Sequence, residues 1–142
     1  RNATRPVEMF SSAGKVGPAY CTGVGKAMMA FLDEAALQGV LARQSFHRFM
    51  PNTLASPERL RAELEVIRTC GFAFDREEHE PGIICIAVPI LARSGKVLGA
   101  VSVTSTTARS SLAALEGLSA TVKETAAQIA DATESWRFPE QR

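Results

Sequence analysis

Cys85 and His79 are the two residues whose types and spacing could support covalent catalysis, because a thiol nucleophile needs a histidine base within reach. They stand six residues apart in the stretch FDREEHEPGIICIAVPI, residues 74–90, with a Pro-Gly turn between them. No neighbouring residue can be assigned as an orienting acid, and a cysteine inside a buried strand usually behaves as a small apolar side chain. The sequence therefore favours a protein that is not an enzyme, and it predicts no catalytic residue.

A metal site in the same stretch would need Asp75, His79 and Cys85 together, and their spacing matches no structural zinc pattern. We therefore predict no metal site and no cofactor. The cysteine count of three is odd, which favours reduced thiols in a cytoplasmic protein over a disulfide framework. The acidic residues before the Pro-Gly predict a solvated surface turn; they are Glu77, Glu78 and Glu80.

Two apolar runs after this turn predict a β-hairpin, with strands over residues 82–91 and 96–105 joined by RSGK. If Ser94 and Gly95 are the two turn residues, directly opposed residues share a face of the hairpin. The predicted pairs are Cys85 with Thr104, Ala87 with Ser102, and Pro89 with Ala100. That face carries small side chains, hydroxyls and a thiol, whereas the other face is bulky and apolar: Ile84, Ile86, Val88, Val101 and Val103.

The small-residue face has two possible uses, and the residues alone leave both open. Small side chains with hydroxyls leave room for a small-molecule pocket. They would equally let a helix approach closely, with the hydroxyls bonded to nearby backbone.

The sequence TGVGK, residues 22–26, could supply an anion site. Thr22 can cap a helix whose first backbone N–H groups, at Gly23 and Val24, would attract a carboxylate. Lys26 is a second candidate for binding an anion. Alternatively, TGVGK is only a capped helix start that needs glycine for close packing.

These candidates need a framework of helices and strands to hold them. Capping residues and apolar spacing predict helices over residues 22–32, 33–41, 56–70 and 112–130, with Gly71 as a stop. The last is predicted as one amphipathic helix whose apolar residues are Leu112, Leu115, Leu118, Val122, Ala126, Ile129 and Ala130. Residues 6–10 and the stretch around Phe72 and Phe74 have strand character. The predicted fold class is α+β, with helices on an antiparallel sheet.

The bulk composition describes one globular domain over residues 1–142, with 46% hydrophobic and 22% charged residues. A net charge of +1 argues against a nucleic-acid-binding surface on this chain. The longest apolar run is too short to cross a bilayer, and no signal peptide is visible, so we expect a cytoplasmic protein without a membrane partner. The chain does not open on methionine, which predicts a processed or truncated chain.

Three stretches carry a resemblance to a known family: GPAYCTGVGKAMMAFL (17–32), MPNTLASPERLRAELEVIRTCGFAFDREEHEPGIICIAVPI (50–90) and GKVLGAVSVTS (95–105). Together they resemble the effector-binding domain of IclR-type transcriptional regulators, from about Arg5 to Ala132. The resemblance implies a GAF-like, profilin-like fold that is truncated at its N-terminus, with an incomplete sheet or an exposed edge. It also implies a homo-oligomer, either dimer or tetramer, whose N-terminal winged helix-turn-helix binds DNA and is absent from this chain.

The resemblance further implies a pocket for a small-molecule effector. The ligand-binding positions it implies are Gly23, Val24, Asp75, Cys85, Ser102 and Thr104, with Met9 and Ile83 as apolar wall. The hairpin pairing had independently placed three of these on one face. We hypothesise a keto, hydroxy or sugar acid with its carboxylate toward Gly23 and Val24 and a hydroxyl toward Asp75. Alternatives are that Asp75 caps local N–H groups, or that the domain only forms dimers or tetramers through its final helix.

Overall fold

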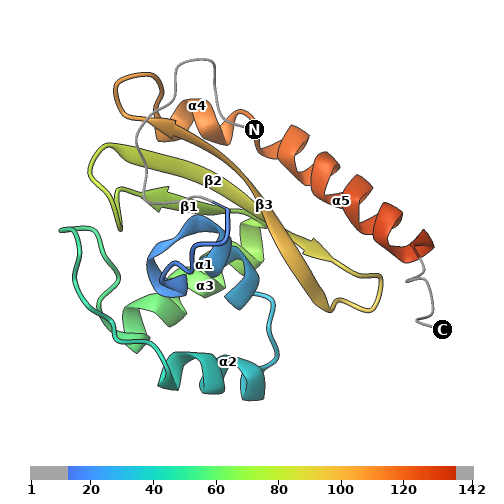
Figure 1. Cartoon of the computed structure of the whole chain (residues 1–142), viewed down its shortest axis with the longest axis horizontal. Helices are drawn as coiled ribbons and strands as arrows, with labels where there is room; N and C mark the ends of the chain where they lie inside the picture. Colours follow the sequence, from blue (N-terminus) through green and yellow to red (C-terminus); the bar gives the residue numbers. More distant parts are fainter. Residues whose placement is uncertain (1–12, 137–142) are drawn as a thin grey trace.

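The computed structural model describes residues 13–136 and has an α+β architecture, as predicted (Figure 1). Its antiparallel sheet has the order β1-β2-β3: Ala73–Arg76, Ile83–Leu91 and Val97–Thr106. One side of the sheet is covered by η1 (Ala19–Cys21), α1 (Gly23–Met29), α2 (Glu34–Ala42) and α3 (Pro57–Cys70). The other side is covered by α4 (Leu112–Glu116) and α5 (Ser119–Ser135). Residues 6–10, predicted as a strand, and Met9 within them lie outside the described residues.

The predicted starts of the first three helices are confirmed by hydrogen bonds from the helix backbone to the capping side chains. The N–H of Gly25 donates to Oγ1 of Thr22 at 3.3 Å, and the N–H of Ala36 donates to Oδ1 of Asp33 at 2.8 Å. Ser56 caps α3 in the same way, and α3 stops at Gly71, whose φ of 83° is left-handed. Local capping chemistry therefore sets these boundaries.

The predicted register of the hairpin is confirmed, although its turn differs. Cys85 pairs with Thr104, Ala87 with Ser102, and Pro89 with Ala100. The turn, however, closes with the N–H of Gly95 donating to the carbonyl of Ala92 at 2.8 Å, so its central residues are Arg93 and Ser94. A register shift between Ile90 and Leu91, which pair with Gly99 and Val97, leaves Leu98 as one extra residue and restores the predicted pairing.

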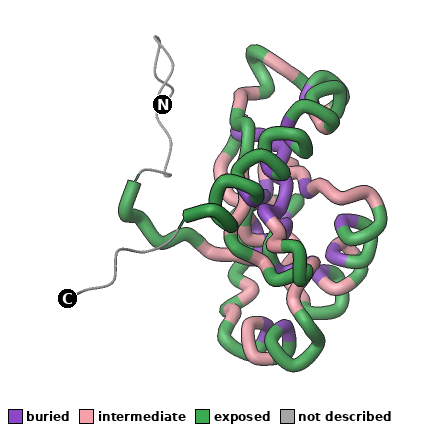
Figure 2. The backbone as a smooth tube through the Cα atoms, turned by 90° about the vertical axis from the view of Figure 1, so that its right-hand side faces the viewer, coloured by how far each residue is buried: buried purple, intermediate pink, exposed green. Residues whose placement is uncertain are grey.

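Two apolar clusters lie on the two faces of the sheet. On the α1 side, Ala73 and Ala87 pack with buried residues of the first helices: Tyr20, Cys21, Ala27, Met29, Ala30, Leu37, Leu41, Leu60, Leu64 and Ile67. On the α5 side, Ile84, Ile86, Val88 and Ile90 pack with Leu115, Val122, Ala126 and Ala130. Figure 2 shows the buried residues gathered between the helices and the sheet, with exposed residues on the outer faces of the helices. The bulky face of the hairpin thus packs on helices, as predicted, except at Val103, which is 37% exposed.

The prediction of one continuous C-terminal helix is wrong in two respects. The helix is interrupted at Gly117 and Leu118, which separate α4 from α5. The low helix propensity of glycine favours an interruption at this position. Leu118 and Ile129, placed in the apolar stripe by the sequence, are 40% and 36% exposed. They flank the buried stripe instead of lying in it. Within residues 13–136, no helix is both long and apolar enough to cross a membrane.

Candidate functional site

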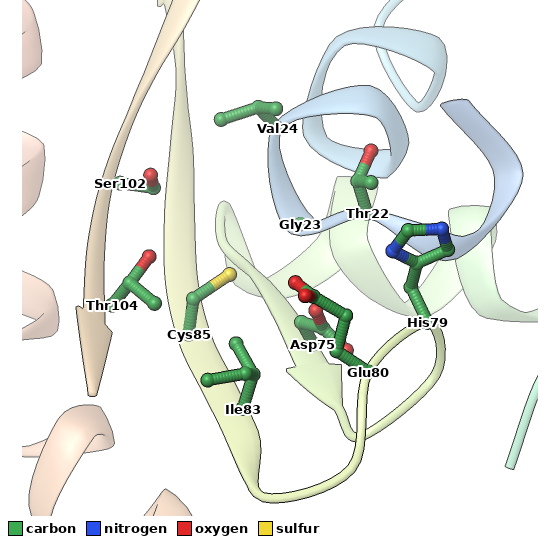
Figure 3. Close-up of a pocket in the computed structure, with 10 residues that line it drawn as sticks. All are labelled: Thr22, Gly23, Val24, Asp75, His79, Glu80, Ile83, Cys85, Ser102 and Thr104. Atoms are coloured by element: carbon green, nitrogen blue, oxygen red, sulfur yellow. The ribbon is translucent and has the colours of Figure 1, made fainter. Parts of the chain in front are cut away.

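A pocket lies where the start of α1 meets the sheet and the turn between β1 and β2 (Figure 3). Its empty space is about 470 Å³, including the part that is open to solvent. The residues that line it are Thr22, Gly23, Val24, Asp75, His79, Glu80, Ile83, Cys85, Ser102 and Thr104. Every predicted site residue that the structure describes is among them, and only Met9 lies outside the described residues.

Three lining residues were not predicted as ligand contacts: Thr22, His79 and Glu80. The last two belong to the acidic stretch that the sequence suggested was a surface turn. The length of the connection could have indicated them, because only seven residues, 76–82, join the predicted pocket residues Asp75 and Ile83. A connection that short keeps its own residues near the pocket.

The α1 wall of the pocket lies directly on the small-residue face of the hairpin. A Cβ added to Gly23 would meet Sγ of Cys85 and would lie 3.3 Å from Cβ of Ala87. Gly25 is equally constrained, because its Cβ would lie 2.6 Å from Cα of Ala19. The sequence left two possibilities open for TGVGK and for the small-residue face, namely close helix packing and a pocket. The structure contains both, because α1 packs closely on the hairpin beside the pocket.

The predictions for Lys26 and Glu78 are wrong. Lys26 is fully buried and is absent from the pocket lining, so it does not present its charge to a ligand there. Its Nζ lies 2.7 Å from Oε2 of Glu78, which is 2% exposed. Glu78 was predicted to be solvated, and the buried cation is the reason that it is not. Glu77 and Glu80 are half-buried as well, and Glu77 accepts a hydrogen bond from the N–H of Gly82 at 2.8 Å.

Asp75 lies at the end of β1 and is 7% exposed. Its Oδ1 accepts a hydrogen bond from the N–H of Glu78 at 2.9 Å, which is the local capping role considered as an alternative. Burial raises the pKa of Asp75 to about 6, and the charges of Glu78 and Glu80 act in the same direction. The carboxyl therefore titrates within the physiological range while it faces the pocket.

Cys85 lies on β2 in the middle of the pocket wall (Figure 3). Burial, together with the charge of Asp75, raises its pKa to about 12, while backbone hydrogen bonds from Asp75 and Gly23 oppose the shift. A thiol with this pKa is protonated at neutral pH, which is unsuited to nucleophilic catalysis. Within residues 13–136, no group of three or more His, Cys, Asp or Glu side chains is arranged to hold a metal ion.

The pocket presents different chemistry on its two sides. Ser102 and Thr104 of β3 contribute hydroxyls from exposed positions, so the pocket is open beside β3. Asp75, Glu80 and His79 lie across from them in Figure 3, with Cys85 between. Hydroxyls can donate to a carboxylate or keto oxygen, whereas ionised carboxylates only accept. The arrangement suits a small ligand that has both acceptors and hydroxyl donors.

Comparison with known proteins identifies the family. The model of the bacterial transcriptional regulator IclR C-terminal domain matches residues 2–131, nearly the whole chain. The chain belongs to the IclR family. This agrees with the resemblance carried by the G-x-G-K-A stretch and by the acidic turn with its following strand. The IclR domain described here is thus the effector-binding domain of a regulator.

The IclR relatives are transcriptional regulators and not enzymes. The HTH-type transcriptional regulator XynR of Escherichia coli K12 is 38% identical over 100 residues, which are 70% of this chain and 40% of XynR. The solved C-terminal domain of E. coli KdgR has a TM-score of 0.77 at 32% identity, covering 87% of this chain and 74% of that one. The Acinetobacter PobR inducer-binding domain, a double mutant in complex with 3-hydroxybenzoic acid, has a TM-score of 0.70 at 26% identity and covers 80% of this chain and 67% of that one. This chain therefore spans less than half the length of a curated relative such as XynR.

Proposed function

We propose that this domain senses a small keto, hydroxy or sugar acid in the pocket between α1 and the hairpin. The proposal is supported by the way in which residues from distant parts of the sequence meet at this pocket. Residues far apart in the sequence, from Gly23 to Thr104, line one cavity that combines backbone donors, hydroxyls and a carboxyl. A concave pocket in which a few polar groups converge is typical of small-molecule sites.

The ligand's carboxylate is placed toward the Gly23–Val24 backbone and the hydroxyls of β3, and a ligand hydroxyl is placed toward Asp75. Asp75 supports this orientation because, when ionised, it repels a carboxylate and accepts from a hydroxyl. The double mutant of the PobR inducer-binding domain forms a complex with 3-hydroxybenzoic acid, which carries both groups on one small molecule. That pairing of carboxyl and hydroxyl is the chemistry we propose for this pocket.

Ligand binding would control DNA binding by a domain outside this chain. XynR is an HTH-type regulator, and the present chain corresponds to 40% of its length. We propose the same division of labour here, in the cytoplasm, with the sensing domain also contributing to a dimer or tetramer. The alternative, an oligomerisation module without a ligand, is favoured by two exposed apolar residues, Leu118 at the N-cap of α5 and Ile129 within it.

A thermal-shift screen against sugar acids, short 2-oxo acids and hydroxybenzoic acids tests the sensing function, because a ligand that binds only the folded chain raises its melting temperature. Calorimetry on the strongest hit then tests the site. Asp75→Ala and Ser102→Ala should each weaken binding by about tenfold, the value of one lost hydrogen bond to a charged group. Ser105→Ala is the matched control, because Ser105 pairs with Ile84 on the other face of the hairpin. Unchanged affinity in both pocket variants would refute this placement of the ligand.

A further inference from the structure

Lys26 of α1 and Glu78 of the β1–β2 turn form an ion pair inside the protein. Their side chains are 0% and 2% exposed, and 2.7 Å separates Nζ from Oε2. Neither residue lines the pocket. A pair removed from water in this way adds little to stability on its own, because the loss of hydration offsets the attraction between the charges. Its location behind the two pocket walls therefore needs a different explanation.

Glu78 organises the turn that presents Asp75 to the pocket. Its N–H donates to Oδ1 of Asp75 at 2.9 Å, and its Oε2 accepts from the N–H of Arg76 at 3.1 Å. Its carbonyl accepts from Oγ1 of Thr53 at 2.6 Å. Glu77, at the centre of the turn, has a φ of 55°, a conformation that non-glycine residues rarely adopt. The bonds made by Glu78 hold this turn in place, so a displaced Glu78 would displace the Asp75 carboxyl.

Lys26 attaches the same turn to the opposite wall of the pocket. It follows Gly23 and Val24 in α1, and its N–H completes the first turn of that helix by donating to the carbonyl of Thr22 at 3.0 Å. Its Nζ also lies 3.5 Å from Oε1 of Glu63 on α3, and this oxygen accepts from Nη1 of Arg76 at 2.7 Å. Through Lys26 and its partners, α1, α3 and the turn are held together.

We propose that Lys26 and Glu78 are positioning residues of the effector pocket, which fix the Asp75 carboxyl opposite the Gly23–Val24 wall and set its charge. The role in effector recognition rests on the proposed function. The placement and the charge of Asp75, however, are properties of the ligand-free chain and can be measured without any effector.

The charges around Asp75 give the proposal a distinctive electrostatic signature. After burial, the hydrogen bond from the N–H of Glu78 lowers the pKa of Asp75, the side-chain charges of Glu78 and Glu80 raise it, and the charge of Lys26 lowers it. Cys21 on η1 and Cys85 on β2 also face Asp75, but burial raises the pKa of each to about 12, so both are neutral thiols. His79 of the same turn shares the pocket. The side-chain charges of Lys26 and Glu78 therefore act on the pKa of Asp75 with opposite signs, so removal of each charge should move that pKa in the opposite direction.

The test is a carboxyl-detected NMR titration of the ligand-free 142-residue chain, in which the midpoint of Asp75 is followed. Glu78→Gln keeps an acceptor oxygen and every backbone bond but removes the charge, so the midpoint should fall by on the order of one pH unit. Adding Lys26→Met to Glu78→Gln removes the opposing charge, so the midpoint should rise again relative to the single variant. The double variant leaves no unpaired buried charge, which favours its folding.

The exposed pair of Arg61 and Glu34, with 2.8 Å between Nη2 and Oε1, supplies matched controls. Glu34→Gln and Glu34→Gln with Arg61→Met should leave the Asp75 midpoint unchanged. Positioning is read from amide hydrogen exchange, which should accelerate by about tenfold at Arg76 and Glu78 in Glu78→Ala but not in α5. The proposal is overturned if the titration midpoint of Asp75 stays the same when both buried charges are removed in turn. It is also overturned if amide hydrogen exchange in the turn is unchanged in Glu78→Ala. If the midpoints shift as expected while no acid binds the wild type, the sensing function fails and the positioning role stands.

Discussion

Gly23 is the residue at which the helix wall of the pocket touches the sheet. Its added Cβ would meet Sγ of Cys85 and lie 3.3 Å from Cβ of Ala87, so Gly23→Ala overfills a closed space. We expect a loss of about 1–3 kcal/mol in the free energy of unfolding, measured by urea denaturation. Acid binding should be lost as well, because the helix start must move away from the hairpin.

A cycle of variants separates this clash from a general effect of alanine. Gly23→Ala combined with Cys85→Ala should lose less stability than the sum of the two single changes, because the second substitution removes the sulfur that the new methyl meets. Gly39→Ala in α2 is the control, since its Cβ would meet only Nη1 of Arg43 at 3.9 Å. It should stabilise the chain by about 0.5–1 kcal/mol, the helix propensity difference. If the two losses of stability are additive, contact with Cys85 does not explain why Gly23→Ala destabilises the chain.

Asp75 makes the stability of the domain depend on pH. Burial raises its pKa from 3.8 to about 6, so folding favours the protonated carboxyl. The contribution of Asp75 is therefore fully present below pH 3.8 and is lost as the pH rises through about 6. Asp75→Asn cannot ionise and keeps an oxygen for the N–H of Glu78. Relative to wild type, it should gain on the order of 2 kcal/mol between pH 4 and pH 7.

Denaturation of wild type and Asp75→Asn across this pH range measures the difference directly. Titration of all other groups is common to both proteins, so only the Asp75 contribution remains in the comparison. Asp131→Asn is the control, because it makes the same Asp-to-Asn change at an exposed carboxyl of α5, in the other layer. It measures any effect of that change that does not depend on burial. Parallel curves for wild type and Asp75→Asn would contradict a raised pKa in the folded state.

At the scale of elements, the hairpin turn contains a glycine whose replacement would change stability through backbone conformation alone. Gly95 has a φ of 87°, and a Cβ added there would have no neighbour within 4 Å. Gly95→Ala should therefore cost about 1–2 kcal/mol from the left-handed conformation alone. Gly95→Asn should cost clearly less, because asparagine tolerates this region. Equal losses in the two variants, measured by thermal denaturation, would mean that the turn rearranges.

The elements that could be predicted are those fixed by local chemistry. Thr22, Asp33 and Ser56 start helices because each side chain accepts from a backbone N–H three residues on. The hairpin turn was misassigned by one residue, yet the register was right because the extra residue Leu98 compensates. The interruption at Gly117 was missed, because apolar periodicity continues across it and only the packing of α4 and α5 distinguishes them.

The candidate site could be predicted where a residue's neighbours follow from strand pairing or from the family pattern. The assumed hairpin turn at Ser94 and Gly95 predicts Cys85, Ser102 and Thr104 on one face, and the register confirms that placement. Glu78 was misjudged because an acidic residue in a turn is ordinarily solvated, and its partner Lys26 lies 52 positions away in the sequence. A buried pair of this kind depends on tertiary contacts that no local pattern contains.

At the scale of the whole molecule, one sheet separates two layers with different tasks. Cys85 and Ala87 of β2 face α1, and Cys85 also lines the pocket, whereas Ile84 and Ile86 of the same strand pack against the α4 and α5 layer. Figure 1 shows α1–α3 and α4–α5 on opposite sides of the sheet. The pocket therefore occupies one layer and leaves the outer surface of α5 available for contact with another copy. Sensing and assembly would use opposite faces of one strand.

The outer surface of α5 carries an exposed apolar row beside its buried stripe. Leu118, Ile129 and Trp136 are 40%, 36% and 60% exposed. Leu118, the N-cap residue of α5, and Ile129 are spaced by eleven residues, about three turns of helix, so they lie on one side of it. Trp136 follows the last helical residue, Ser135, in an extended conformation. We expect this row to contribute to self-association, because a solvent-exposed line of large apolar side chains is typical of a contact surface.

Leu118→Glu combined with Ile129→Glu should convert the proposed dimer or tetramer to monomer, because two carboxylates would be buried without partners at the contact. Light scattering after size exclusion, over a range of protein concentrations, measures the mass. Thr121→Glu with Gln128→Glu is the matched control, since it adds the same charge at exposed positions on another side of α5. If both double variants keep the wild-type mass, the assembly uses a different surface.

If the wild type is already a monomer at every concentration, α5 does not associate in this chain. Retained acid binding in the Leu118 and Ile129 variant would show that sensing needs only the layer on the α1 side of the sheet.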